Sequence, residues 1–167
     1  HVGVLAMLAD IALNAQDWPR AQEIAETLAQ IGTPEADAAT RALQAALLLG
    51  QNRTEDGLAF LEEQVGKGGD DLAAIQVILQ ARIRSGKPDE ARTYLDGELA
   101  KRPDDPGLRL LSAGLHALMG EVSQAEALFR DLIAEDPTAE LPARLLYGLL
   151  RSDGRAEEAA AVLDAAL

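Results

Sequence analysis

PGLRLLSAGLHALMGEVSQAEALFRDLIAEDPTA, residues 106–139, is the stretch that decides the fold. Its apolar residues recur every three or four positions in two runs, which is the period of an amphipathic α-helix. Gly120 separates the two runs, and Asp136-Pro137 ends the second, because Pro cannot continue a helix. The stretch therefore predicts a pair of helices joined by a tight turn.

The same pattern recurs along the chain. A small residue stands near the start of each expected second helix, at Ala21, Gly57, Ala91, Ala125 and Ala159, with spacings of 36, 34, 34 and 34 residues. A fixed period of this length indicates a repeat protein. Small residues are expected where the two helices of a pair cross, because a larger side chain there would push the helix axes apart, at a cost of about 1–3 kcal/mol.

Six residues of the first stretch have a characteristic order and spacing: Gly120, Glu121, Val122, Ala125, Phe129 and Pro137. In these residues the stretch resembles a tetratricopeptide repeat (TPR), and the chain resembles an Ala/Leu-rich TPR array of bacterial type. The resemblance implies an all-α fold, a right-handed α-solenoid of about five helix-turn-helix repeats. The repeats are predicted at residues 2–35, 36–71, 72–105, 106–139 and 140–167 of one superhelical domain, itself a fragment of a longer chain. A flexible inter-repeat loop is expected at Gly66-Lys67-Gly68-Gly69.

Composition narrows the possible partners. The net charge of −13 argues against nucleic acid and anionic lipid, which need clustered Lys and Arg. No apolar run reaches the roughly 18 residues of a membrane span. The absence of Cys removes disulfides and thiolate zinc sites, and leaves the compartment open. Nucleic acid and direct membrane insertion are therefore not expected, and the TPR resemblance implies a protein or peptide partner.

The sequence offers little for catalysis, and we expect no enzyme activity, cofactor or metal. Its two histidines are His1 and His116. His116 stands where the family usually buries an aromatic residue, so a packed structural imidazole is favoured over a ligand-facing one. Adjacent carboxylates such as Glu62-Glu63 are expected on solvated faces.

Charge differs between the two helices of each repeat. Most of the 28 acidic residues fall in the turns and second helices, whereas several Arg residues fall in first helices. In TPR stacks the first helices line a concave groove, so the resemblance implies an apolar, mildly basic groove inside an acidic exterior. The equally open reading is that the acids only keep the outside soluble. The predicted groove residues are Met7, Leu43, Gln76, Val77, Gln80, Arg84, Leu110, Leu111, Leu118, Arg144, Leu145 and Arg151.

Two classes of function stay open at this point. In the first, the chain is a protein-interaction scaffold whose groove binds an apolar, partly acidic peptide or helix. In the second, it is a structural or regulatory arm of a larger enzyme or of a cell-envelope or secretion protein, with its groove filled by the same chain. Weak self-association through the terminal repeats is expected in addition, because solenoid ends expose apolar surface.

The repeat register predicts which second-helix residues are buried. Phe129→Ala should lower the free energy of unfolding by about 3–5 kcal/mol, because it truncates a buried aromatic side chain. Glu126→Ala is expected to change it by no more than about 0.5 kcal/mol, as an exposed residue would. Denaturant melts of the two variants measure both values, and equal losses would mean that the register is wrong.

Overall fold

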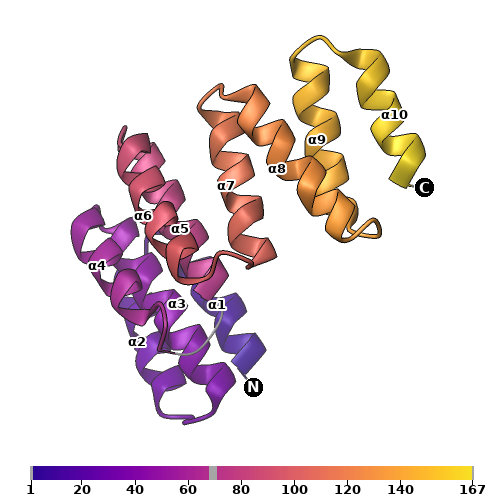
Figure 1. Cartoon of the computed structure of the whole chain (residues 1–167). Helices are drawn as coiled ribbons and strands as arrows, with labels where there is room; N and C mark the ends of the chain where they lie inside the picture. The colour runs from indigo at the N-terminus through magenta and orange to yellow at the C-terminus, as the bar shows by residue number, and fades with distance from the viewer. Residues whose placement is uncertain (1, 68–70, 167) are drawn as a thin grey trace. The chain divides into compact units, whose positions relative to one another are not determined.

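The computed structural model describes residues 2–67 and 71–166, with the side chains of residues 71 and 163–166 left out of the description. Within these residues the chain forms ten α-helices and no strand (Figure 1). The predicted all-α class, with five helix-turn-helix pairs of the solenoid type, is confirmed. The helices are α1 (Val2–Asn14), α2 (Trp18–Ala29), α3 (Pro34–Gly50), α4 (Thr54–Gln64), α5 (Asp71–Arg84), α6 (Pro88–Lys101), α7 (Pro106–Leu118), α8 (Val122–Glu135), α9 (Glu140–Ser152) and α10 (Ala156–Ala166).

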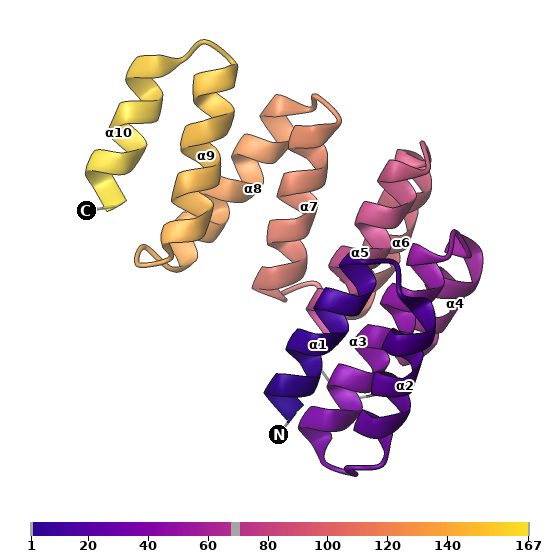
Figure 2. The same ribbon diagram turned by 180° about the vertical axis from the view of Figure 1, so that it is seen from behind.

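The helices group into two compact units, His1–Ala81 and Arg82–Leu167, and the boundary falls inside α5. In the N-terminal unit α1 packs on α2 and α3, and α3 also packs on α2 and α4. In the C-terminal unit each helix from α6 to α10 packs on the next, as the two opposite views in Figures 1 and 2 show for α8, α9 and α10. The prediction of a single superhelical domain stays a prediction. Gly68 and Gly69 of the expected flexible loop lie outside the described residues.

The turn inside each helix pair has the same geometry in all five repeats. Five residues before each small crossing residue, the backbone has a positive φ, between 56° and 82°, at Gln16, Asn52, Gly86, Gly120 and Gly154. The next residue donates its N–H to a carbonyl five positions back, as Glu121 does to His116 at 2.9 Å. This is the left-handed helix ending that satisfies the last carbonyls of the first helix and turns the chain into the second.

The crossing residues are buried as predicted. Ala21, Ala91, Ala125 and Ala159 have no solvent-exposed area. At Gly57, an added Cβ would lie 2.9 Å from Cδ2 of Leu49, so a methyl group there would require the Leu49 side chain to move. Close approach of first and second helices is therefore a packing requirement that recurs once in every repeat.

Each unit has its own core around these crossings. In the N-terminal unit Ile24, Ala25 and Leu28 form a cluster with Ala9 and Ala12, and Trp18 packs against it. In the C-terminal unit the cluster is built around Phe129, which is 1% exposed, so its predicted burial is confirmed. Short helices of this kind need such tertiary packing, because helices of fewer than about 12–15 residues are marginal alone.

The turn geometry predicts that exchanging glycine and another residue changes the free energy of unfolding by different amounts at different turn positions. Gln16→Gly should raise the free energy of unfolding by about 0.5–1 kcal/mol, because a residue with a Cβ is strained at φ 56° and Gly is not. Asn52→Gly should have a smaller effect, since Asn tolerates this conformation better. Gly120→Ala should be destabilising. Chemical denaturation of the three variants tests the account, and a gain in stability from Gly120→Ala would contradict it.

Candidate functional site

The predicted groove residues of the N-terminal unit are mostly exposed, with one exception. Met7 is 65% exposed, and Gln76, Val77 and Gln80 lie on the outside of α5. Gln76 and Gln80 are one helical turn apart, so their amides share one side of α5. The assignment of Leu43 to the groove is wrong, because Leu43 is buried.

The burial of Leu43 has a packing cause. Leu43 belongs to the same packed cluster as Ala9 and Ala12 of α1. These small residues allow α1 and α3 to approach, and the larger Leu43 side chain then fills the space in the core. Small residues on a neighbouring helix therefore decide whether a first-helix leucine faces the core or the solvent.

The C-terminal unit holds the remaining predicted residues on two neighbouring helices, α7 and α9, except Arg84 at the end of α5. Helix α7 contacts α9, and both pack on α8. Leu110 packs against the core cluster. Arg84, near the start of this unit, is exposed. The others are Leu111 and Leu118 of α7 and Arg144, Leu145 and Arg151 of α9, and with the exposed Leu141, which was not predicted, they form what we call the α7–α9 face. Leu111 is half-buried, and the rest of the face is exposed.

The centre of the α7–α9 face carries two glycines. Gly114 and Gly148 lie inside α7 and α9, each eleven residues before the crossing alanine of its repeat, and both are exposed. An added Cβ at either position would meet no atom within 4 Å. Gly inside a helix is destabilising by roughly 0.5–1 kcal/mol relative to Ala. Helix packing therefore gives no reason for these glycines, whereas a ligand backbone that approaches the face closely would.

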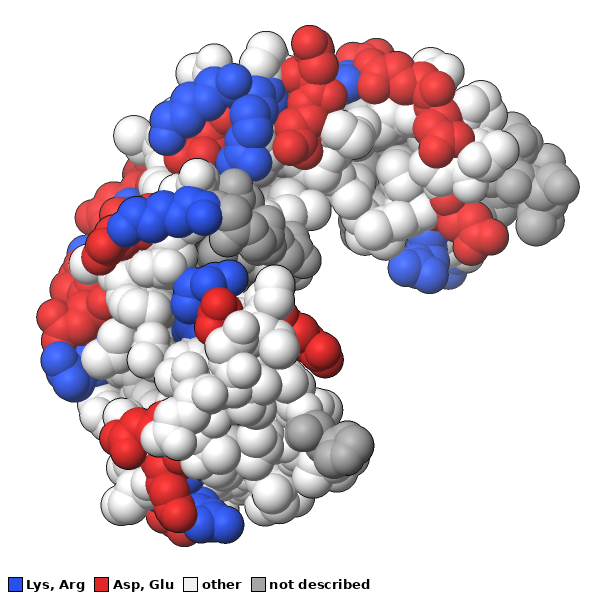
Figure 3. Space-filling model, turned by 90° about the horizontal axis from the view of Figure 1, so that it is seen from below, with Lys and Arg blue, Asp and Glu red and all other residues white. Residues whose placement is uncertain are grey.

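The charged groups of the α7–α9 face are basic. Arg144 is exposed on α9, and the guanidinium of Arg151 lies 5.9 Å from the centre of the Tyr147 ring, which holds it in a cation–π contact. Elsewhere, on the side of the molecule shown in Figure 3, acidic side chains mostly adjoin basic ones, and uncharged surface lies between these clusters. Arginines next to exposed leucines suit a ligand with apolar anchors and carboxylates.

The second helices of the C-terminal unit are joined by ion pairs at equivalent positions. Nη1 of Arg155 lies 2.5 Å from Oε2 of Glu126, and Arg92 pairs in the same way with Glu121. In each pair the two partners are 29 residues apart, but the base comes first in Arg92–Glu121 and the acid comes first in Glu126–Arg155. Each pair joins the residue after the crossing alanine of one repeat to the residue before the second helix of the next.

These contacts correct the expectation for Glu126. It also accepts a hydrogen bond from Nε of Arg130 at 2.8 Å, and its side chain is 16% exposed. Hydrogen bonds from Arg155 and then Arg130 hold the pKa of Glu126 below its usual 4.5. Glu126 is therefore an ion-paired residue of the repeat junction, and Glu126→Ala is no neutral control.

The imidazole of His116 makes a hydrogen bond to a carboxylate in the turn that follows its helix. Its Nδ1 lies 2.5 Å from Oε2 of Glu121, which also pairs with Arg92. Hydrogen bonds from Arg92 and His116 lower the pKa of Glu121. This supports the structural interpretation of His116, although its partner is a carboxylate rather than an apolar core.

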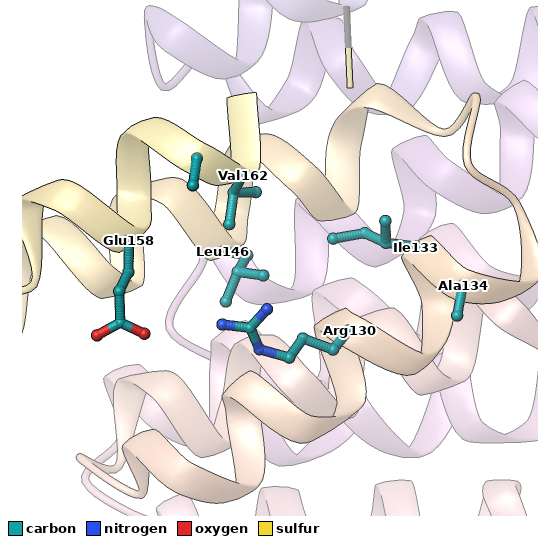
Figure 4. Close-up of a pocket in the computed structure, with 7 residues that line it drawn as sticks. Arg130, Ile133, Ala134, Leu146, Glu158 and Val162 are labelled. Atoms are coloured by element: carbon teal, nitrogen blue, oxygen red, sulfur yellow. The ribbon is translucent and has the colours of Figure 1, made fainter. Parts of the chain in front are cut away.

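A second candidate site lies between α8 and α10 and was not predicted. It is a cavity of about 400 Å³, and its walls include Ile133 and Ala134 of α8, Leu146 of α9, and Ala161 and Val162 of α10. Figure 4 shows these side chains around the space between α8 and α10, with Arg130 and Glu158 the charged residues among them. The sequence signal that could have indicated it is the pair of small and aliphatic stretches Ile133-Ala134 and Ala161-Val162 on successive second helices.

Chemical sites of other kinds are not seen in the described residues. Across residues 2–67 and 71–166, no group of three or more His, Cys, Asp or Glu side chains is placed to hold a metal ion. In the same part of the chain, no helix combines the length and apolarity needed to cross a bilayer.

Comparisons with known proteins agree on the fold. Residues 82–146 match the family model described as tetratricopeptide repeat. A crystal structure of MamA has a TM-score of 0.57 and 15% identity, and the alignment covers 99% of this chain and 90% of that one. A second MamA structure, designated MSR-1, has a TM-score of 0.55 and 17% identity, and the alignment covers 97% of this chain and 94% of that one. The structure of YrrB, described as a TPR protein with an unusual peptide-binding site, has a TM-score of 0.55 and 15% identity. The alignment covers 95% of this chain and 80% of that one. None of the curated proteins compared with the sequence matches it.

The low pKa of Glu126 makes part of the stability dependent on pH. A carboxyl with a depressed pKa in the folded state stabilises the fold above its ordinary pKa and loses that effect as pH falls through the folded value. Glu126→Gln should therefore be destabilising at pH 7, and its difference from wild type should shrink below pH 4.5. Urea melts at several pH values measure this difference.

The matched control uses the main partner of Glu126. In an Arg155→Gln background, Glu126→Gln should cost less at pH 7, because one of the two stabilising arginines is already absent. An unchanged cost in that background would contradict the junction pair.

Proposed function

Because this chain is a tetratricopeptide-repeat protein, we propose that it is a protein-interaction scaffold whose α7–α9 face binds an apolar, partly acidic peptide or helix. The TPR match over residues 82–146 includes most of this face, and a structural neighbour is described as having a peptide-binding site. Both support a protein-binding role of a general kind. The choice of the face and of the ligand chemistry rests on the residues themselves.

The observation that carries the proposal is the pair of glycines at the centre of the face. Gly114 and Gly148 stand in open space inside two neighbouring helices, where Ala would stabilise the protein. A ligand backbone that passes over them can approach the helices more closely than any side chain would allow. The leucines around them then provide apolar contacts on both sides of that path.

The side chains of the face indicate which ligand fits. Leu118 of α7 is 63% exposed, and Leu141 and Leu145 of α9 are exposed as well, so apolar surface is open to solvent. Such patches commonly mark interaction sites. Arg144 and Arg151 provide guanidinium groups, which pair well with carboxylates. A segment with aliphatic anchors and flanking Asp or Glu satisfies both features.

The exposed first-helix residues Met7, Gln76, Val77, Gln80 and Arg84 are proposed as further contacts of the same kind. Their amides and apolar groups suit the backbone and side chains of a bound segment. The role proposed throughout is binding and not catalysis. Weak self-association through the terminal repeats is proposed as a second, separate interaction.

Two labelled pools of short peptides test the ligand chemistry. Both pools carry Leu and Ile at helical spacing, but one has Glu and Asp between them and the other has Lys and Arg. Fluorescence anisotropy should show binding of the acidic pool. Arg144→Glu/Arg151→Glu should weaken that binding by about tenfold or more, because two charge-assisted contacts become repulsive, while leaving the melting temperature nearly unchanged.

The glycines provide the sharper test, since stability and binding should move in opposite directions. Gly148→Leu should raise the free energy of unfolding, because Leu has a higher helix propensity, and should block the path of the ligand backbone. Gly97→Leu is the matched control, since Gly97 also stands in open space, on α6 away from the face. It should give the same gain in stability without loss of binding. Equal binding by wild type and Gly148→Leu, or preference for the basic pool, would contradict the proposal.

A further inference from the structure

A pocket in the N-terminal unit lies at the junction between the first two repeats. Its volume is about 320 Å³, and its walls come from α2, α3, α4 and the turn between α3 and α4. Gln22 of α2 and Arg53 of that turn are among the residues that line it. Small-molecule sites are clefts of roughly 300–1,000 Å³. This cleft, which we call the α2–α4 pocket, is therefore large enough for a small ligand.

Gln22 and Arg53 occupy the two repeat positions that form an ion pair at a later junction. Gln22 directly follows the crossing residue of its repeat, as Glu126 does. Arg53 stands four residues before the crossing residue of the next repeat, as Arg155 does. Nη1 of Arg155 lies 2.5 Å from Oε2 of Glu126, whereas Gln22 has no charge with which to pair Arg53. The first junction therefore has the base of this ion pair without its acid.

The hydrogen bonds of Arg53 show which part of its guanidinium is unused. Its Nε donates to Oδ2 of Asp56 at 2.9 Å. Nε of Arg155 donates in the same way to Oε1 of Glu158, but Arg155 also uses Nη1 and Nη2 for Glu126. Within the described part of the chain, Nη1 and Nη2 of Arg53 have no acceptor. They are placed to bind a carboxylate, which a guanidinium can hold through two parallel hydrogen bonds.

The other walls of the α2–α4 pocket combine amide groups with apolar surface. Gln44 of α3 is half-buried, and Gln51 follows the end of that helix. Neither side-chain amide forms a hydrogen bond with another described residue, and each can both donate and accept. The apolar part of the lining is Leu47, Leu48 and Phe60. A ligand that fills the pocket therefore needs an amide group and an apolar body as well as a negative charge.

We propose that the α2–α4 pocket binds a small molecule that carries a carboxylate, an amide group and an aliphatic or aromatic body. The carboxylate takes the part that the Glu126 side chain has at the later junction and accepts hydrogen bonds from Nη1 and Nη2 of Arg53. The amide group bonds to Gln44 and Gln51, and the apolar body lies against Phe60. This site is separate from the α7–α9 face, so either proposal can fail without the other.

Probes that differ only in charge test the proposal. N-acetyl-phenylalanine and N-acetyl-leucine carry all three groups, and their carboxamides lack only the negative charge. NMR titration of the isotope-labelled chain, up to about 10 mM of each probe, follows the side-chain amide signals of Gln44 and Gln51. At least one acid should shift these signals with a Kd of about 1 mM or tighter, and its carboxamide should bind about tenfold more weakly. Equal binding of acid and carboxamide, or no shift with either acid, would overturn the proposal.

Substitutions at the junction positions test which group binds the carboxylate. Arg53→Gln should weaken binding of the acid by about tenfold and have a much smaller effect on its carboxamide, because only the acid uses the charge. Gln22→Glu should also weaken binding of the acid by about tenfold. The new side chain supplies the acid that Glu126 supplies at the later junction, so it competes for Arg53 and repels the probe. Unchanged binding in Arg53→Gln would overturn the proposal.

Two control variants make the same charge changes elsewhere in the N-terminal unit. Arg20→Gln removes another exposed arginine that has an acidic partner three residues later, and Gln30→Glu adds an acid just after α2. Neither residue lines the pocket, so both variants should bind the acid as wild type does. Losses as large as those from Arg53→Gln and Gln22→Glu would indicate a general charge effect and overturn the assignment of the site.

The two proposed sites are separated by exchanging their variants and ligands. Arg53→Gln should bind the acidic peptide pool as wild type does. Arg144→Glu/Arg151→Glu should bind the N-acetyl acid as wild type does, because neither arginine lines the α2–α4 pocket. Loss of acid binding in Arg144→Glu/Arg151→Glu would place the probe on the α7–α9 face and overturn the pocket as its site.

Discussion

The close crossing of the two helices in each repeat is the constraint on which the rest of the structure depends. Ala21, Ala91, Ala125 and Ala159 are completely buried, and at Gly57 even a methyl group would collide with Leu49. The left-handed turn five residues earlier brings the second helix back onto the first at this point. With crossing and turn fixed, every other position of the repeat has a defined side of its helix. Burial then follows from which neighbouring helix covers that side.

This regularity makes exceptions informative. Leu8 and Ile11 of α1 are exposed, whereas the residues at the same repeat positions of α7 and α9 are buried, so equivalent positions differ in their surroundings. Gly114 and Gly148, which helix packing does not require, lie on the α7–α9 face that we propose as the ligand-binding surface. The reversed ion pairs Arg92–Glu121 and Glu126–Arg155 show that junctions with the same geometry differ in chemistry. The proposed binding surface therefore depends on side chains that differ between repeats, on a backbone whose turn and crossing geometry does not.

The sequence predicted the architecture well because periodic small residues and glycine turns are local signals. The five helix pairs, the buried Phe129 and the crossing alanines all followed from that period. The contacts that side chains make with other helices were harder to predict from the sequence. Leu43 was assigned to the groove but lies in the core, because its surroundings depend on Ala9 and Ala12 in another helix. Glu126 was expected on a solvated face, but its partner Arg155 is 29 residues away. The α8–α10 cavity requires three helices at once, and no single helical period reveals it.

The most direct test of the account is amide hydrogen exchange of the protein with and without the apolar, acidic peptide pool. The account predicts new protection in α7 and α9 around Gly114 and Gly148, because a bound backbone would lie against them. Exchange in α8 and α10 around Ile133 and Val162 should stay as in the free protein. Protection confined to α8 and α10, with α7 and α9 unchanged, would contradict the account and place the ligand in the cavity between the second helices.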